Sequence, residues 1–398
     1  MKKKLIQSSI QSIGYMMLVV LFFASCANDD SVSQASGRDQ EFAAPPSSPI
    51  AGEYIITLNE SPSFRTTDYA YSTTNDMLRS EYVSTFSIAD EDIIHTYGYA
   101  MNGFAAKLTK EQYDQLRQDP RIASISQNEL IQFINPIKSV NPTTTAQEEP
   151  WGVQRVGGFG DGTGKTAWVI DTGIDFTHPD LNVNREKSVS FVAGTDGNDD
   201  NGHGTHVAGT IAAKNNGQGV VGVAANAEVV AVKVLNFFGS GSWADVIAGI
   251  DYVAANGKEG DAANMSLGGF ANDEIDQAVQ NAASKGIYFA LAAGNDGQNA
   301  EDYSPARAEG ENIFTVSAVD SNDELAYFSN YGDVVEFAAP GVDIYSTYMG
   351  GRYETLSGTS MASPHVCGLL LLNDGRVNSD GEAQKYPDGF TPDPIAHR

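Results

Sequence analysis

The chain has 398 residues, enough for two or three domains that each bury a core. Its formal net charge is −27, and residues 150–398 carry most of the excess, with 33 acidic against 13 basic side chains. A surface this acidic disfavours binding to nucleic acid and to anionic membranes. With two cysteines, Cys26 and Cys367, the chain is not a disulfide scaffold.

Residues 1–25 have the pattern of an export signal: a lysine-rich start, an apolar stretch over residues 13–23 and two small residues. Cys26 follows directly, which resembles a bacterial lipoprotein signal and predicts a lipidation site. The alternative is an ordinary cleaved signal. We therefore expect an exported bacterial protein, either a lipoprotein of the cell envelope or a secreted one. The apolar stretch is too short for a permanent membrane span, so Cys26 is the expected membrane contact.

Residues 26–51 are rich in Ser, Ala, Asp and Pro and are predicted to form a flexible linker. Residues 52–135 alternate in a β-α-β-β-α-β order, which is typical of a small ferredoxin-like α+β domain. Thr109 is placed to cap the second helix. The predicted strands are Tyr54–Leu58, Ile93–Tyr97, Gly103–Leu108 and Ile122–Ile125, and the predicted helices are Thr74–Phe86 and Glu111–Gln118.

Residues 136–149 contain prolines and threonines and are predicted to be an exposed linker. Residues 150–372 alternate short β-branched strands with helices, an α/β pattern that predicts a parallel sheet with helices on both faces. Residues 373–398 are acidic and rich in Gly and Pro, so we expect an irregular tail on the surface. The strands are predicted at Ala167–Ile170, Ser188–Val192, Glu228–Leu235, Asn264–Leu267, Ile287–Ala292, Ile313–Ala318 and Val334–Phe337, and the helices at His206–Ala213, Trp243–Ala255, Glu274–Ala283 and Met361–Leu372.

Three separate motifs offer the members of a nucleophilic triad: Asp171-Thr-Gly173, His203-Gly-Thr-His206 and Gly358-Thr-Ser-Met-Ala-Ser-Pro-His365. A serine hydroxyl is a weak nucleophile until a histidine takes its proton, and a carboxylate orients that histidine. Asp171 directly follows an apolar strand, where active residues of such sheets gather, whereas Asp175 lies further into the turn. His203 and Ser360 each precede an apolar helical run.

With these motifs, the stretches Ala-Ala-Gly-Asn295, Tyr303-Ser-Pro-Ala306 and Phe328-Ser-Asn-Tyr-Gly332 make residues 151–370 similar to the subtilase family, in its proteinase K-like branch. The resemblance implies a serine endopeptidase that works through an acyl-enzyme on Ser360, without a cofactor for catalysis. His203 is then the base and His206 a structural residue. Asn295 would complete the oxyanion hole.

The resemblance also implies that a substrate strand pairs between two edges beside a roomy apolar pocket. Small, uncharged walls predict a preference for apolar or aromatic residues before the scissile bond, with Trp243 lining a second pocket upstream. Protein and peptide substrates are the expected partners. The implied substrate-binding residues are Gly239, Ser240, Gly241, Trp243, Ser266, Leu267, Gly268, Gly269, Ala292, Ala293 and Gly294.

The stretch Met101-Asn-Gly-Phe-Ala-Ala-Lys-Leu-Thr109 resembles the inhibitory propeptide that precedes many subtilases. This implies that residues 52–135 inhibit the enzyme intramolecularly and that self-cleavage falls in the linker 136–149. A monomer is expected. An inactive binding module is the alternative function, disfavoured because all triad positions and Asn295 are present.

A structural calcium ion is a further implication of the resemblance. Proteinase K-like enzymes bind calcium through an aspartate and two backbone carbonyls. Here the corresponding residues are Glu336, Glu311 and Ile313, so a glutamate stands in place of the aspartate. Cys367 is expected to be a buried thiol on the helix of the serine.

Overall fold

The computed structural model describes residues 48–59, 61–63, 66–132, 137–139 and 146–398. The predicted signal, the lipidation site at Cys26 and residues 26–47 of the predicted linker lie outside these residues. In the described part of the chain, no helix combines the length and the apolar character that crossing a membrane requires. The first strand begins at Ser48, so residues 48–51 belong to a folded element and not to a flexible linker.

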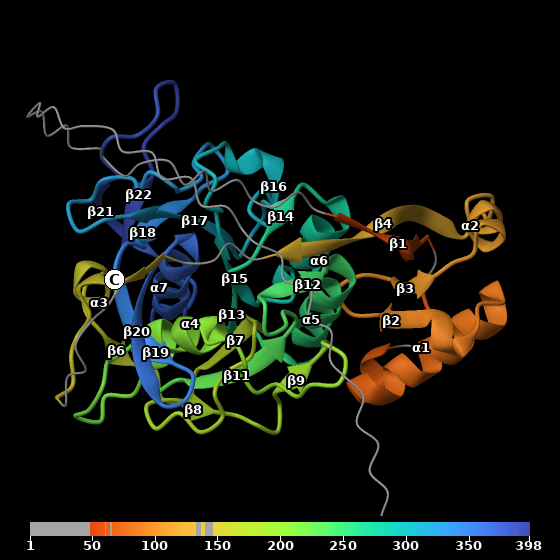
Figure 1. Cartoon of the computed structure of the whole chain (residues 1–398), viewed down its shortest axis with the longest axis horizontal. Coiled ribbons are helices and arrows are strands. Elements are labelled where there is room, and N and C mark those ends of the chain that lie inside the picture. The colour runs from red at the N-terminus through yellow and green to blue at the C-terminus, as the bar shows by residue number, and fades with distance from the viewer. Residues whose placement is uncertain (1–47, 60, 64–65, 133–136, 140–145) are drawn as a thin grey trace, which may run out of the picture. The chain divides into compact units, whose positions relative to one another are not determined.

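The N-terminal domain, residues 48–132, has the predicted ferredoxin-like order (Figure 1). Its strands form an antiparallel sheet in the order β4-β1-β3-β2. Leu78 and Tyr82 of the first helix pack on Ile56 and Phe104 of the sheet. The elements are β1 (Ser48–Leu58), η1 (Thr66–Asp68), α1 (Tyr71–Phe86), η2 (Asp90–Asp92), β2 (Ile93–Tyr97), β3 (Gly103–Lys107), α2 (Lys110–Leu116) and β4 (Ile122–Gln132).

The start of α2 confirms the predicted cap. The Thr109 hydroxyl accepts a hydrogen bond from the Gln112 N–H at 3.2 Å, and the Gln112 side chain accepts one from the Thr109 N–H at 2.9 Å. This reciprocal pair satisfies two backbone donors that the first helical turn cannot bond internally.

The C-terminal domain, residues 146–398, is built on one large sheet in the order β21-β22-β18-β17-β15-β13-β7-β11-β8, with β9 also paired to β11. All neighbours are parallel except the edge pair β21–β22. The strands are β7 (Thr166–Asp171), β8 (Asn182–Val183), β9 (Val189–Ser190), β11 (Glu228–Lys233), β13 (Ala262–Met265), β15 (Tyr288–Ala292), β17 (Ile313–Val319), β18 (Phe337–Pro340), β21 (Asn378–Glu382) and β22 (Pro394–His397).

Helices cover both faces of this sheet, as predicted (Figure 1). Trp168 and Ile170 of β7 pack with α5 (Trp243–Asn256) and α6 (Asp273–Ala283). Their neighbours Ala167 and Val169 face the other way, toward α4 (His203–Ala212) and α7 (Thr359–Leu372). Because both faces are buried, the strand is a continuous apolar run with no polar alternation.

Short elements complete the C-terminal domain and the segment before it. The hairpin β19–β20 was not predicted, although the glycine pair at its turn, Gly350-Gly351, is a strong hairpin signal. The elements are β5 (Ile137–Ser139), α3 (Trp151–Arg155), β6 (Gly160–Asp161), β10 (Ala224–Ala225), β12 (Ser240–Ser242), β14 (Gly269–Phe270), η3 (Ala300–Asp302), β16 (Tyr303–Ser304), β19 (Ile344–Tyr348) and β20 (Arg352–Ser357).

Two predictions about the C-terminal domain were wrong. The tail is not irregular: β22 joins the large sheet beside β18, with Ile395 and Ala396 buried. Its four residues are too few to stand out in an acidic, Gly- and Pro-rich context. The strand predicted at Val334–Phe337 begins only at Phe337, because Val334 and Val335 follow the turn at Gly332 and pack on alanines instead of pairing.

Candidate active site

Asp171 and His203 form a buried hydrogen-bonded pair. The His203 Nδ1 lies 2.8 Å and 3.0 Å from the two carboxylate oxygens of Asp171, and both side chains are almost fully buried. Asp171 ends β7, as expected, and its Oδ1 also accepts the Thr172 N–H at 2.6 Å. A carboxylate bonded to Nδ1 fixes the imidazole so that Nε2 faces the reaction.

Two features bring the helix of His203 close to Asp171. Gly204 allows the approach, because a Cβ there would lie 2.1 Å from the carbonyl oxygen of Gly173. Asp199 holds the start of α4: one oxygen accepts the N–H groups of Asn201 and Gly202, and the other accepts the N–H and hydroxyl of Thr205. A negative charge at a helix N-terminus is favourable, although burial raises the pKa of this carboxyl.

Ser360 lies in the first turn of α7, which packs against α4 on the same face of the sheet. The two reactive side chains are thus both at helix N-termini and both nearly buried. The Ser360 hydroxyl donates to the carbonyl oxygen of Ser266 at 3.2 Å. Ser266 in turn donates its own hydroxyl to the Ser360 carbonyl at 2.8 Å, so the two residues hold one another.

Asn295 sits beside the residue that precedes the serine. Its Oδ1 accepts the N–H and the hydroxyl of Thr359, both at 2.8 Å. The amide nitrogen is the remaining polar atom of the side chain, a donor next to Gly358. This arrangement suits the predicted role, in which the amide and backbone N–H groups at the start of α7 stabilise a developing oxyanion.

The competing residues of each motif lie elsewhere. The ring of His206 bonds the backbone carbonyls of Ile344 and Glu354 at 3.0 Å and 3.1 Å, and burial lowers its pKa to about 3. Asp175 accepts hydrogen bonds from Thr177 and from the N–H groups of Gly350 and Gly351. Both are structural groups, consistent with the choice of His203 and Asp171. Cys367 is buried on α7, as predicted.

Trp243 forms a wall between the two predicted substrate edges, residues 239–241 and residues 266–269. The indole ring is fully buried, and a Cβ at Gly269 would lie 2.9 Å from it and 3.3 Å from Ile131 of the N-terminal domain. Ala292 and Ala293 are buried, and Ala293 packs in a cluster with Ala300 and Ala306. Ser266 differs from the expectation, since its side chain lies under the serine helix, bonded to the Ser360 carbonyl and to Ser363, and only its backbone carbonyl contacts the Ser360 hydroxyl.

The N-terminal domain is paired with the first of these edges. β4 runs antiparallel to β12, with Gln132 opposite Ser240, Ile131 opposite Gly241 and Leu130 opposite Ser242. Figure 1 shows β4 reaching toward β12 above α5 and α6. Ile131 is thereby buried in the same cluster as Trp243. The chain's own strand therefore lies on a predicted substrate edge.

A second pairing involves the strand that leads to the serine. Ile137–Ser139 form β5, antiparallel to β20, with Ile137 opposite Ser357. Ser357 precedes Ser360 by three residues. Residues 133–136, between β4 and β5, lie outside the described part of the chain.

Sequence reasoning missed several residues that hold the site together. No structural role was predicted for Asp199, Thr359 or Ser363. Asp251 on α5, which docks the N-terminal domain, carries no local signal at all. The Asp-Asp-Asn-Gly turn before His203 was a usable hint of an N-terminal helix cap.

Of the residues expected to bind calcium, Glu336 would supply a side-chain carboxylate, and Glu311 and Ile313 would supply backbone carbonyls. Glu336 Oε2 accepts the Thr315 N–H at 2.6 Å, and burial, with smaller effects from Glu309 and Asp393, raises the Glu336 pKa to about 7. Glu311 is exposed and Ile313 is buried at the start of β17. No group of three or more His, Cys, Asp or Glu side chains suited to a metal occurs in the residues that the structure describes.

Comparison with known proteins agrees with this geometry. A model described as the subtilase family matches residues 162–383, and one described as peptidase inhibitor I9 matches residues 53–133. The chain is 39% identical to alkaline serine exoprotease A of Vibrio alginolyticus over 83% of its own length and 61% of that protein's. It is 37% identical to alkaline serine protease ver112 of Corniculantispora psalliotae, with 81% and 80% covered.

A solved structure gives the same result for the fold. A cold-adapted subtilisin-like serine proteinase superposes with a TM-score of 0.54 and 38% sequence identity, covering 63% of this chain and 97% of that one. The matched family model spans more than half of the chain and includes Asp171, His203 and Ser360. The chain therefore belongs to the subtilase family of serine proteases and carries a peptidase inhibitor I9 domain in front of its protease domain.

Proposed function

We propose that the chain is the precursor of an exported serine endopeptidase that hydrolyses peptide bonds through an acyl-enzyme on Ser360 and cuts off its own N-terminal domain. The observation that carries this is the pairing of β4 with β12, next to the Asp171–His203 pair. An extended strand laid on a sheet edge is how a protease holds a peptide, because main-chain hydrogen bonds fix it whatever its sequence.

The chemistry follows from the geometry. His203, held by Asp171 through Nδ1, takes the proton of the Ser360 hydroxyl through Nε2 as the oxygen attacks the carbonyl carbon. The oxyanion that forms is stabilised by the Asn295 amide and by backbone N–H groups at the start of α7. His203 then gives its proton to the leaving amine, and a water molecule releases the acyl group by the same path.

We place the self-cleavage site between Gln132 and Ile137. The support is that β4 pairs with β12 at a predicted substrate edge and β5 pairs with β20, the strand that leads to Ser360, so we expect the bond presented to the serine to fall between β4 and β5. This interval overlaps the linker 136–149, where the sequence put the cut, only at residue 136. After the cut, the N-terminal domain would remain bound as an inhibitor until it dissociates or is degraded.

Ser360→Ala tests this function. The purified variant should stay at full length, whereas the wild type should separate into two fragments whose new ends, read by mass spectrometry, lie within residues 132–137. Ser284→Ala, an exposed serine on a distant turn, is the matched control and should mature normally. Maturation of Ser360→Ala without another protease, or failure of a fluorophosphonate probe to label Ser360 in the wild type, would contradict it and favour an inactive binding module.

Two finer proposals concern export and calcium. Cys26 would carry a lipid, and labelled fatty acid should be incorporated into wild type but not into Cys26→Ala. A calcium ion would be held by Glu336 and the carbonyls of Glu311 and Ile313, and its charge would stabilise the Glu336 carboxylate, whose pKa is raised mainly by burial. Calcium should then raise the melting temperature of the wild type more than that of Glu336→Gln; an equal effect on both would reject the site.

A further inference from the structure

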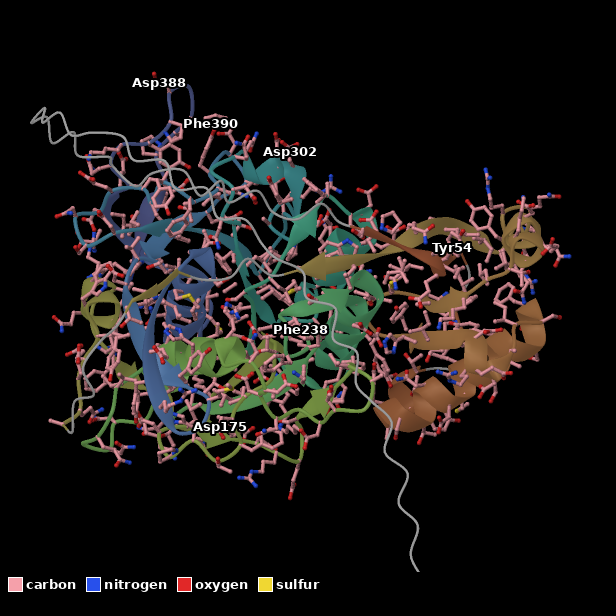
Figure 2. All side chains as sticks on the ribbon, viewed as in Figure 1. Tyr54, Asp175, Phe238, Asp302, Asp388 and Phe390 are labelled. Atoms are coloured by element: carbon pink, nitrogen blue, oxygen red, sulfur yellow. The ribbon has the colours of Figure 1, made fainter. Side chains whose placement is uncertain are left out.

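Lys233 is a buried cation beside Asp171. It ends β11, and Asp171 is its register partner at the end of β7. Asp175 and Phe238, which are labelled in Figure 2, follow the ends of these two strands and locate the region. The Lys233 side chain has no exposed surface. A buried charge destabilises a fold unless its donors are paired, so the partners of this ammonium group define its role.

An ammonium group has three N–H donors, and here each has an acceptor. The Nζ atom donates to the carbonyl of Thr172 at 2.6 Å, to Oδ1 of Asp200 at 2.7 Å and to the carbonyl of Leu235 at 2.9 Å. Thr172 directly follows Asp171, and Asp200 lies three residues before His203. One cation therefore joins the segment that carries the aspartate to the turn that carries the histidine.

The backbone that follows Lys233 also holds Asp171. The N–H groups of Val234 and Leu235 both donate to the Asp171 carbonyl, at 2.9 Å and 3.2 Å. Because the ammonium group donates to the Leu235 carbonyl, it fixes the peptide segment that makes these two bonds. The end of β11 thus acts on the aspartate through its backbone and through its side chain.

The hydroxyl of Thr172 makes a second connection between the same two segments. It donates to Oδ1 of Asp199 at 2.9 Å and accepts the Gly204 N–H at 2.9 Å. Thr172 is therefore held at its carbonyl by the ammonium group and at its hydroxyl by the start of α4. Without the ammonium group only the hydroxyl contacts remain, and the adjacent carboxylate can shift relative to the ring of His203.

We propose that Lys233 is a positioning residue, which holds the two backbone segments around Asp171 and His203 in the geometry that proton transfer requires. The proposal rests on the proposed protease function. The physical basis is that the rate of a reaction between positioned groups depends steeply on their placement. A displacement of about 1 Å costs up to about a hundredfold in rate.

This role predicts a change in kcat without a change in KM. The three partners of the ammonium group lie outside the predicted substrate edges, residues 239–241 and 266–269. The turn before the first edge is closed by its own hydrogen bond, from the Asn236 N–H to the Ser240 carbonyl at 2.8 Å. Loss of the ammonium group should therefore leave substrate binding intact and impair the transition state, in which His203 moves a proton.

The test uses mature enzyme prepared from the full-length precursor, with its active sites titrated to completion by a fluorophosphonate. The value of kcat then refers to folded sites only. Lys233→Met keeps the length of the side chain and removes the charge and all three donors. On an internally quenched peptide with Leu before the scissile bond, its kcat should fall about ten- to hundredfold, with KM within about twofold of wild type.

The matched control is Lys165→Met. This substitution also removes an ion-paired lysine, one that lies directly before β7 and contacts Asp374 at 2.6 Å. Lys165 is at the opposite end of the strand from Asp171. Both kcat and KM of the control should equal those of the wild type.

Two further variants keep the test decisive if Lys233→Met does not fold. The side chain of Asp200 is 41% exposed, so its replacement is compatible with folding. Asp200→Ala removes one of the three acceptors and should lower kcat about three- to tenfold at unchanged KM. Asp200→Asn keeps an acceptor oxygen and should recover most of this loss.

The positioning role would be overturned by an unchanged kcat per titrated site in Lys233→Met, or in Asp200→Ala where the first variant does not fold. A loss confined to KM, or to the number of titrated sites, would overturn it as well, because it would show a role in substrate binding or in folding alone. A wild type that cleaves no peptide would overturn the protease function, and the positioning role with it.

Discussion

Asp251 of α5 accepts a hydrogen bond of 2.6 Å from the backbone N–H of Ala100 in the N-terminal domain. The same carboxylate oxygen accepts the N–H groups of Tyr99 at 2.7 Å and Gly98 at 3.2 Å. Three backbone donors of one turn thus converge on one buried side chain. Asn281 of α6 adds a hydrogen bond to the Ala100 carbonyl at 2.7 Å. The two helices hold the turn that leads from β2 to β3, and this contact is separate from the β4–β12 pairing.

Removing the Asp251 carboxylate should weaken inhibition by the N-terminal domain. In Asp251→Ala three buried N–H groups lose their acceptor, so we expect the affinity of the cleaved domain to fall about tenfold or more. The readout is the lag between self-cleavage and full peptide hydrolysis, which should shorten. Asp251→Asn keeps an acceptor oxygen, so its lag should be close to that of the wild type. Equal lags for Asp251→Ala and wild type, with equal activity of the matured enzymes, would contradict this role.

The same carboxyl should make the inhibitory complex depend on pH. Burial is the main cause that raises the Asp251 pKa, to about 6, against an ordinary value of 3.8, while its backbone hydrogen bonds act in the opposite direction. A raised carboxyl pKa means that the complex binds more protons than the separated domains. The contribution of the Asp251 carboxyl to the stability of the complex is fully present below pH 4 and is lost as the pH rises to about 6. The inhibitor should therefore be released more readily at pH 7 than at pH 4.

The control for this pH effect is Asp251→Asn, which cannot ionise. Inhibition constants of the cleaved N-terminal domain, measured from pH 4 to pH 7, should rise more steeply for wild type than for the variant, by up to about fiftyfold. Other titrating contacts between the domains are common to both proteins and cancel in the comparison. If the inhibition constants of wild type and variant changed with pH in parallel, Asp251 would stay in one protonation state.

A side chain at position 269 should close the pocket against Trp243. A Cβ there would lie 2.9 Å from the indole ring and 3.3 Å from Ile131, so valine would occupy the space that Ile131 fills. In Gly269→Val, kcat/KM for peptides with Ile at the Ile131 position should fall at least about tenfold. For peptides with Ala at that position, kcat/KM should fall less. The kcat/KM values of Gly269→Ala should lie between those of the wild type and those of Gly269→Val. A uniform loss over all peptides would indicate a general distortion instead.

The residue before the scissile bond should be apolar. The predicted pocket walls, Ser266–Gly269 and Ala292–Gly294, carry no charged side chain, so an unpaired charge would be buried at a cost, whereas each methylene gains about 0.8 kcal/mol. Peptides with Phe, Tyr, Leu or Met there should exceed those with Lys, Arg, Asp or Glu by at least about tenfold in kcat/KM. A peptide series varied only at that residue measures this, and a preference for Lys or Arg would show that an acidic group reaches the pocket.

Much of the fold and of the catalytic centre could be predicted from the sequence because the signals are local. The cap at Thr109, the strand Ile93–Tyr97 and the continuous apolar run of β7 depend on neighbours a few residues away, and the structure confirms them. Asp171, His203 and Ser360 each stand inside a motif at a strand end or helix start. The neighbouring residues in each motif predicted the strand or helix that holds it. The packing of α4 and α7 on the parallel sheet then determined where these strand ends and helix starts lie.

Only the tertiary structure decided which backbones meet. Asp251 binds three N–H groups about 150 residues away, β4 pairs with β12, and β22 adds to β18. Each of these contacts uses backbone donors and acceptors that almost every residue carries, so the sequence holds no mark of the partner. Local chemistry along the chain therefore determined what the site can do, and long-range packing determined that the chain's own strand lies beside it.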